Sequence, residues 1–454
     1  MTAPRLPRAR AAVRRLRTLA LCGAATAVVA GCTLPQGLAP VASVQPTADL
    51  TRVVAAQPWQ GRYSANPAVM RDAAGRSWQP DAGIAHGGQL VRTSAPIAGT
   101  ASPALYQAQR RGAVTFDIPV PAAGTYAVDL LLAETGGLHA GQRVFDVLAQ
   151  GTTRARSVDV AARVGLAHAD HVVVPVLVTS GALHLELRGL VGAPSVGAVD
   201  VALVSSATTG ERTAFDDSFS GPAGTAPSTT WQAQTGGRWG GGAELQAYTA
   251  RPSNVALDGS GHLALTARRE TYTGADGATN SYTSARLETG GQYSFRYGRV
   301  SAVMQVPAGT SYWPAFWGLG DTVGTATWPS SGEIDVAEVI GQRPSAVDGH
   351  VHGPTTSGAS FGPGYEQTAA TSLALGFHTY SALWLPDSVS FSLDGKDYGT
   401  VDRADLPASQ LWVFDQPEHL VLNLAVGGAW AGAPDASTPS KATLLVDRTT
   451  VARW

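Results

Sequence analysis

Short runs in which apolar and polar residues alternate, bounded by Gly, Pro, Asn and Asp, recur along most of this 454-residue chain. A period of two places alternate side chains on opposite faces of a strand, and no long stretch repeats apolar residues with the period of a helix. The runs lie at residues 114–120, 126–133, 172–178, 183–187, 199–204, 263–267, 299–306, 333–339, 378–385, 389–393 and 419–425. Asp394-Gly395, between two of these runs, predicts a two-residue hairpin turn. With 52 Gly, 28 Pro and only 15% charged residues, the chain is expected to be all-β, with tandem antiparallel β-sandwich domains.

The first 50 residues have the composition of export and tether segments. Six arginines between Arg5 and Arg17 precede an apolar run from Leu19 to Ala30 that is too short for a transmembrane helix, which predicts a signal peptide over residues 1–31. The end of this run resembles a bacterial lipobox, so we expect cleavage before Cys32 and a lipid on its sulfur. A plain secretory signal with an incidental cysteine is the alternative. Residues 32–50, rich in Pro, Ala, Gln, Ser and Thr, predict a flexible tether, which makes the protein extracytoplasmic and either anchored to the membrane or secreted.

Two folded domains are predicted after the tether, at residues 51–206 and 207–454. Loss of residues 1–31 removes six arginines and no acidic residue, which leaves 26 basic against 34 acidic residues and a net charge of −8. This balance argues against a nucleic-acid partner. The other cysteine, Cys22, lies in the predicted signal peptide, so no disulfide is expected. We expect a monomer.

One predicted strand, Gly332-Glu333-Ile334-Asp335-Val336-Ala337-Glu338, carries three carboxylates in an apolar run. Buried unpaired carboxylates are costly, so this arrangement requires a reason. Alternation places Glu333 and Asp335 on one face, and Glu338 joins them only if a β-bulge inserts one extra residue, which we assign to Ala337. Leaning side chains could then approach the ~5–5.5 Å that separates the carboxyl groups of a retaining glycosidase. A solvated acidic face or a metal-binding cluster is the alternative for the string alone.

The residues around this strand make the second domain resemble glycoside hydrolase family 16, in the bulged-motif branch that includes laminarinases. Upstream lies the aromatic run Tyr312-Trp313-Pro314-Ala315-Phe316-Trp317, and downstream lie His350-Val351-His352 and Asn423-Leu424-Ala425-Val426-Gly427-Gly428. The matching segments are 244–249, 254–255, 261–267, 282–286, 297–299, 313–320, 333–338, 377–380, Trp384 and 423–428. The resemblance implies a concanavalin-like jelly roll with a substrate cleft.

Carried over to this sequence, the resemblance implies Glu333 as the nucleophile, Glu338 as the general acid/base, and Asp335 between them. The nucleophile must be ionised while the acid holds a proton. We expect Asp335 to share a proton with Glu333 and so to tune both catalytic groups. His352 matches a family histidine on the next strand, and we expect it to bond to Asp335 or Glu338, with a structural histidine as the alternative.

Further residues are candidates for substrate contacts. Trp313, Trp317 and Trp430 offer flat faces for sugar rings, although one of the first two could belong to the core. Arg286 and Asn254 are candidates for hydrogen bonds to sugar hydroxyls, with structural roles as the alternative. The chain also departs from the family pattern. It has His350 where a small polar residue is more common, Asp348 in place of a common histidine and Ser301 in place of a frequent glutamate, and its last strand, residues 446–451, lacks the usual Tyr and Arg.

These features predict a retaining endo-hydrolase of β-1,3-glucan that needs no catalytic metal. Relatives suggest a structural calcium ion, but no sequence element identifies its ligands. The alternatives within the family are a β-1,3/1,4-glucanase, a galactan hydrolase or a transglycosylase. A glucan-binding surface receptor is the alternative outside enzymes, although recognition alone does not require paired acids on a bulged strand.

The first domain resembles a malectin-like carbohydrate-binding domain. The resemblance is carried by Trp78-Gln79-Pro80-Asp81, by Gly141-Gln142-Arg143-Val144-Phe145-Asp146-Val147 and by Gly197-Ala198-Val199-Asp200-Val201. Trp78 and Tyr106 are the aromatic candidates for a sugar-binding face, and core packing is the alternative for both. A structural spacer is the alternative for the whole domain.

Overall fold

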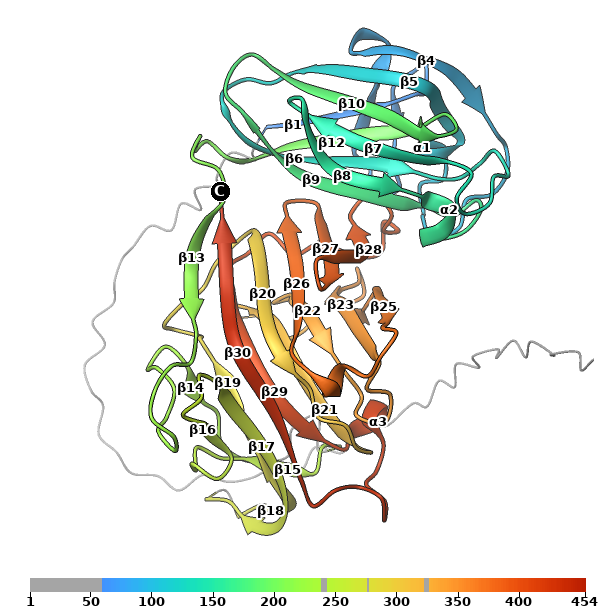
Figure 1. Cartoon of the computed structure of the whole chain (residues 1–454). Coiled ribbons are helices and arrows are strands. Elements are labelled where there is room, and N and C mark those ends of the chain that lie inside the picture. Colours follow the sequence, from blue (N-terminus) through green and yellow to red (C-terminus); the bar gives the residue numbers. More distant parts are fainter. Residues whose placement is uncertain (1–58, 238–242, 276, 322–325) are drawn as a thin grey trace, which may run out of the picture. The chain divides into compact units, whose positions relative to one another are not determined.

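The computed structural model describes residues 59–454 except 238–242, 276 and 322–325. The predicted signal peptide, the tether and Cys32 lie outside the described residues. Strands dominate the described chain, whose α-helices are the four-residue segments α1 (Ala104–Gln107), α2 (Val160–Arg163) and α3 (Gly428–Ala431) (Figure 1). The prediction of an all-β chain is confirmed.

The N-terminal sandwich consists of two six-stranded sheets, with strand order β2-β3-β1-β12-β6-β9 in one and β11-β5-β10-β7-β8 in the other, where β4 pairs with β5. Its strands are β1 (Gln60–Ser64), β2 (Met70–Arg71), β3 (Ser77–Pro80), β4 (Ala85–Arg92), β5 (Ala108–Pro119), β6 (Gly124–Leu132), β7 (Val144–Ala149), β8 (Thr152–Val158), β9 (Asp170–Val178), β10 (Ala182–Val191), β11 (Ser195–Val196) and β12 (Ala198–Ser205). Neighbouring strands are antiparallel except for β1 and β3. Fully buried side chains such as Phe116, Tyr126 and Phe145 form its core.

The C-terminal sandwich consists of a ten-stranded and an eight-stranded sheet. The first has the order β15-β18-β17-β30-β20-β26-β27-β28, with β13 on β30 and β16 on β17; the second has the order β14-β19-β29-β21-β22-β23-β24, with β25 on β23. The strands of the first sheet are β13 (Arg212–Asp217), β15 (Gln246–Tyr248), β16 (Val255–Leu257), β17 (Leu263–Thr273), β18 (Thr279–Ser284), β20 (Gly298–Gln305), β26 (His378–Leu385), β27 (Ser388–Leu393), β28 (Lys396–Asp402) and β30 (Lys441–Arg453). Those of the second are β14 (Gln232–Ala233), β19 (Arg286–Glu288), β21 (Tyr312–Gly320), β22 (Glu333–Glu338), β23 (Ala346–Pro354), β24 (Ser360–Phe361), β25 (Gly364–Thr368) and β29 (Glu418–Val426). The predicted domain bounds stay predictions, although β12 ends at Ser205 and β13 begins at Arg212.

The hairpin predicted at Asp394-Gly395 is confirmed. These two residues join β27 to β28, whose ends pair through Leu393 and Lys396. Both turn residues have positive φ, 52° and 75°, as the mirror-image turn of a two-residue hairpin requires. The turn chemistry therefore determined this part of the fold locally.

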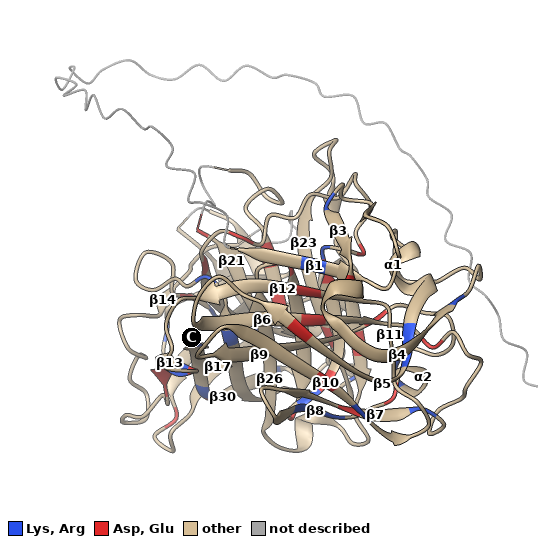
Figure 2. Ribbon diagram, turned by 90° about the horizontal axis from the view of Figure 1, so that it is seen from above, with Lys and Arg blue, Asp and Glu red and all other residues tan. Residues whose placement is uncertain are grey.

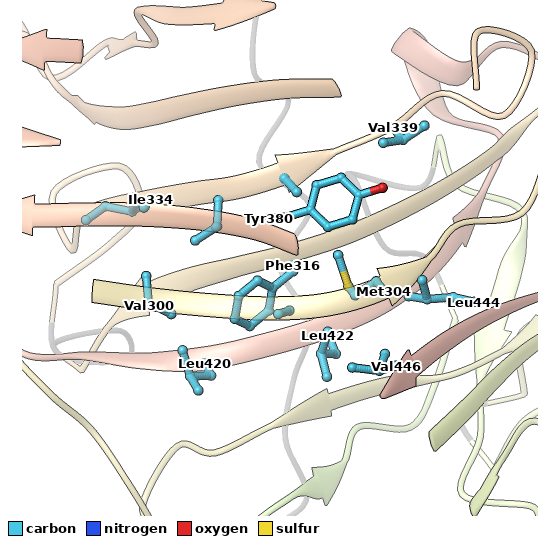
Figure 3. Close-up of a cluster of buried hydrophobic side chains, with 14 of the residues drawn as sticks. Val300, Met304, Phe316, Ile334, Val339, Tyr380, Leu420, Leu422, Leu444 and Val446 are labelled. Carbon is cyan, nitrogen blue, oxygen red and sulfur yellow. The ribbon is translucent and has the colours of Figure 1, made fainter. Parts of the chain in front are cut away.

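The core of the C-terminal sandwich lies between its two sheets. In Figure 3, Phe316 of β21 and Leu422 of β29 come from one sheet, and Met304 of β20 and Tyr380 of β26 come from the other. All four are almost completely buried, and each such side chain stabilises the fold by about 1.5–3 kcal/mol through burial. Because side chains alternate along β21, the core position of Phe316 directs its odd-numbered neighbours to the opposite, outer face of the sheet.

Blue (Lys, Arg) and red (Asp, Glu) segments both occur across the described ribbon, and neither colour is confined to one part of it (Figure 2). Many of these residues form close pairs. The buried Arg143 guanidinium, for example, lies 2.6 Å from a carboxylate oxygen of Glu134. The absence of a nucleic-acid partner stays a prediction.

Candidate active site

Strand β22 presents its three carboxylates on the outer face of the eight-stranded sheet. Glu333 pairs with Leu319, Asp335 with Trp317 and Glu338 with Ala315, which are all odd-numbered positions of β21. The register shifts between Asp335 and Glu338 against both neighbouring strands, so the predicted β-bulge is confirmed.

The identity of the extra residue differs from the prediction. Ala337 pairs with Phe316 on β21, and Val336 is the residue left without a partner there. Both are almost fully buried in the core, so two successive residues point inward and Glu338 returns to the outer face. We call this outer face, defined by Glu333, Asp335 and Glu338, the acidic face.

Two carboxyl groups of the acidic face, those of Asp335 and Glu333, hold their protons more tightly than usual. Burial, followed by the charge of Glu338, raises the pKa of Asp335 well above its usual range. Burial, followed by the charge of Asp335, raises the pKa of Glu333 to about 8, while His352 and an indole N–H of Trp328 oppose the rise. Three carboxyl groups this close cannot all ionise together, because like charges repel strongly where water is excluded. A proton retained by Asp335 removes its repulsion and favours an ionised Glu333.

Two histidines of β23 face these carboxyl groups. Nε2 of His352 lies 3.2 Å from Oδ2 of Asp335 and 4.0 Å from Oε1 of Glu333. Nδ1 of His350 lies 3.6 Å from Oε2 of Glu338. The strand register explains this placement, since Glu333 pairs with His352 and Asp335 pairs with His350. The structure therefore places His352 beside Asp335, as predicted.

Two tryptophans adjoin Glu338. The indole Nε1 of Trp313 donates a hydrogen bond of 2.9 Å to Oε1 of Glu338. Trp430, in α3, packs edge-on against the Trp313 ring with centroids 5.3 Å apart. Gly428 permits this contact: its φ is +90°, and a Cβ there would lie 3.2 Å from the Trp313 ring. Trp430 is exposed, so both rings lie where a substrate could reach them.

Trp317 and Arg286 lie together near Asp335. The Arg286 guanidinium lies 4.6 Å from the centre of the Trp317 ring, which is a cation–π distance. The indole Nε1 of Trp317 donates to Oδ1 of Asn423 at 2.7 Å, and Nε of Arg286 donates to Glu288 at 2.7 Å. Trp317 is half-buried on the outer face, so the core alternative for this residue is not supported.

Asn254 does not belong to the acidic face, and its predicted contact with substrate is wrong. It is completely buried. Its amide nitrogen donates to the carbonyl of Thr266 and to the hydroxyl of Thr283, both at 2.9 Å, while its oxygen accepts from Thr249 at 2.6 Å. Through these bonds the Asn254 amide links segments of the ten-stranded sheet, and it is not available to bind sugar.

The aromatic candidates of the first domain are also core residues. Trp78 and Tyr106 are both fully buried. The Trp78 indole donates to Asp72 at 2.9 Å, and the Tyr106 hydroxyl lies 2.9 Å from Nε2 of His171. Neither ring offers a sugar-binding face, because each is enclosed by its own packing.

Sequence reasoning missed the role of Trp328. Its Nε1 donates to Oε2 of Glu333 at 3.1 Å, and half of the side chain is exposed. The available signal was its place five residues before Glu333.

Glu333, Asp335 and His352 are the residues of the acidic face and its surroundings that could together bind a metal ion, because their ligand atoms lie within 4.8 Å of one another.

The sequence is similar to known protein families over both domains. A family model described as glycosyl hydrolases family 16 matches residues 244–446, and a malectin domain model matches residues 63–205. A beta-glucanase of Rhodothermus marinus is 38% identical over 239 residues, which are 49% of this chain and 79% of that protein.

A glucan endo-1,3-beta-glucosidase A1 of Niallia circulans is 32% identical over 259 residues, which are 53% of this chain but only 38% of that longer protein. Among solved structures, an endo-beta-1,3-glucanase of Pyrococcus furiosus is 34% identical and aligns over 54% of this chain and 94% of its own, with a TM-score of 0.49.

Proposed function

Because the chain belongs to glycosyl hydrolase family 16, we propose that it hydrolyses β-1,3-glucan internally and with retention of configuration. The observation that carries the proposal is the bulge in β22, which brings Glu333 and Glu338 onto one face with Asp335 between them. This is the carboxylate pair that a double displacement at a sugar carbon requires.

In the first step the ionised Glu333 attacks the anomeric carbon, and Glu338 gives its proton to the departing glycosidic oxygen. The Trp313 N–H bonded to Oε1 of Glu338 stabilises the carboxylate that this transfer leaves behind. In the second step Glu338 takes a proton from water, and the resulting hydroxide equivalent displaces Glu333 from the sugar.

Asp335 and His352 support Glu333 in this scheme. The high proton affinity of Asp335 keeps a neutral group beside the nucleophile, and His352 lies within 3.2 Å of Asp335 to orient it. Trp328 donates to the other side of Glu333 and favours its ionised form. A neutral neighbour and an N–H donor together lower the cost of ionising the nucleophile.

The substrate assignment rests on the names of the relatives, which act on β-glucan and β-1,3-glucan. Incubation with laminarin, mixed-linkage glucan and agarose, followed by sizing of the products, tests it. We expect laminarin to be cut into a series of oligosaccharides. Cleavage of agarose alone, or release of single glucose units only, would contradict the assignment.

The substitution Glu333→Gln distinguishes the hypothesis of an enzyme from that of a glucan-binding receptor. Gln keeps the shape of Glu but cannot attack carbon, so turnover should fall by at least a thousandfold while binding of laminarin remains. Unchanged turnover would overturn the mechanism. Binding by a wild-type protein that shows no turnover on any glucan would instead favour the receptor.

We further propose that the protein is extracytoplasmic, is anchored through a lipid on Cys32 and acts as a monomer. None of the described helices is long and apolar enough to cross a membrane. Cell fractionation of Cys32→Ala tests the anchor: release of the variant from the membrane fraction is expected, and equal retention would contradict it.

We also propose that the protein binds a structural calcium ion. A chelator should then lower the melting temperature, and added calcium should restore it.

A further inference from the structure

We propose that His350 is a positioning residue for Glu338. The Nδ1–H group of His350 bonds to the oxygen of Glu338 that delivers the catalytic proton. This inference rests on the proposed function, because it assigns a task within the same double displacement. His350 stands where the family pattern more often has a small polar residue, so the inference concerns this chain in particular.

The two oxygens of Glu338 have different surroundings. Oε1 already accepts the indole N–H of Trp313, and an N–H can only donate. The proton that goes to the glycosidic oxygen therefore sits on Oε2. That oxygen faces Nδ1 of His350 at 3.6 Å, somewhat beyond a hydrogen bond. Catalytic hydrogen bonds are often this long before substrate binds and shorten in the complex.

Nδ1 of His350 is buried and makes no hydrogen bond to any described residue. A buried polar atom without a partner destabilises the fold, so its retention requires an explanation. A bond to Oε2 of Glu338, formed during the reaction, supplies one.

The ring of His350 is held in place by its neighbours. Gly364 of β25 pairs with His350, and a Cβ at Gly364 would lie 2.1 Å from Cδ2 of the ring, so only glycine leaves this space. The ring stacks on His352 at 6.1 Å with an interplanar angle of 26°, and the edge contact with Trp430 has centroids 6.5 Å apart. These contacts fix the direction in which Nδ1 points.

Titratable side chains face His350 from the neighbouring strand and adjoin it on its own strand. Glu338 and Asp335 face it from β22, and Asp348 and His352 adjoin it on β23. Glu366 of β25 lies opposite Asp348. In this acidic setting a hydrogen-bond donor is the useful contribution of the ring. No proton leaves His350 in the reaction: Oε2 gives its proton to the glycosidic oxygen, and the resulting carboxylate oxygen accepts the Nδ1–H.

Three substitutions test this geometry. Asn places an amide nitrogen near the position of Nδ1, Gln places one near the position of Nε2, and Leu provides no donor. We expect kcat/KM on laminarin to fall about tenfold in His350→Leu and His350→Gln, but less than threefold in His350→Asn. His378→Asn is the matched control, because His378 pairs with Asp394 away from the acidic face and its substitution should leave kcat/KM unchanged.

The dependence on leaving group separates positioning of the proton donor from a structural role. A dinitrophenyl β-laminaribioside has a leaving group that needs no proton, so the Leu and Gln variants should lose less than twofold in kcat/KM on it. Equal losses on laminarin and on this substrate would overturn the proposal, as would an Asn variant as impaired as the Leu variant, or no loss in any variant. Circular dichroism verifies that each variant folds. If His350→Leu misfolds, His350→Gln takes its place in the comparison with His350→Asn. Absence of wild-type turnover in the same assay would contradict the proposed function instead.

Discussion

Trp313→Phe removes one hydrogen bond from the acid/base and leaves an aromatic ring in its place. The indole N–H lies 2.9 Å from Oε1 of Glu338, which is the length of a normal N–H···O bond. Hydrogen bonds to charged groups contribute about 1.5–3 kcal/mol, and the half-buried position of Trp313 places this one near the lower limit. Since about 1.4 kcal/mol corresponds to a factor of ten, the variant should lose about tenfold in rate.

The loss should appear in the step that requires proton donation, because the N–H stabilises the carboxylate more than the acid. We therefore expect kcat/KM on laminarin to fall about tenfold, with little change on a dinitrophenyl glycoside. Trp430→Phe is the matched control: it removes an indole from the same aromatic pair but not the bond to Glu338. A loss below twofold in Trp313→Phe, or an equal loss in both variants, would refute the reasoning.

Three further results are expected. Glu333→Gln should stabilise the protein increasingly as pH rises from 5 to 8.5, by up to roughly 4 kcal/mol at the upper end. In the unfolded chain Glu333 ionises at its ordinary pKa, whereas in the folded protein its pKa is about 8, so the wild type loses stability over this range and Gln, which does not titrate, does not. Equal melting temperatures of the two proteins at pH 8.5 would contradict this. Asn254→Ala should cost about 3 kcal/mol and lower the melting temperature by roughly 5–10 °C without changing KM, because the buried partners of the amide lose their bonds; a raised KM with normal stability would restore Asn254 to the substrate site. Arg286→Lys should raise KM about fivefold, because the guanidinium that covers the Trp317 ring is worth about 1 kcal/mol; an unchanged KM would show that Trp317 keeps its position without it.

Local sequence patterns predicted the strands, the hairpin and the bulge, because each depends on residues adjacent in the chain. Alternation put Glu333 and Asp335 on one face, and their spacing to Glu338 required one extra residue. The choice between Val336 and Ala337 could not be made locally. Both are apolar, and the pairing of Ala337 with Phe316 on another strand decides it.

The errors concern residues whose environment is formed by distant segments. Asn254 is buried because Thr266 and Thr283, from other strands, use its amide. Nothing in the residues next to Asn254 distinguishes such a structural amide from one that binds sugar. The contact between His350 and Glu338 similarly depends on the register of β22 against β23, which the bulge shifts. The chemistry of the site was therefore predictable from the motif, but the partners of individual side chains were not.

The central claim, that Glu333 is the nucleophile of a double displacement, is tested most directly by trapping the covalent intermediate. The wild-type protein is incubated with a 2-deoxy-2-fluoro-laminaribioside that carries a dinitrophenyl group, then digested and analysed by mass spectrometry. The label should be found on the peptide that contains Glu333, on that side chain, and should be absent in Glu333→Gln. A label on Asp335 or Glu338, or products of inverted configuration from an enzyme that remains unlabelled, would contradict the account.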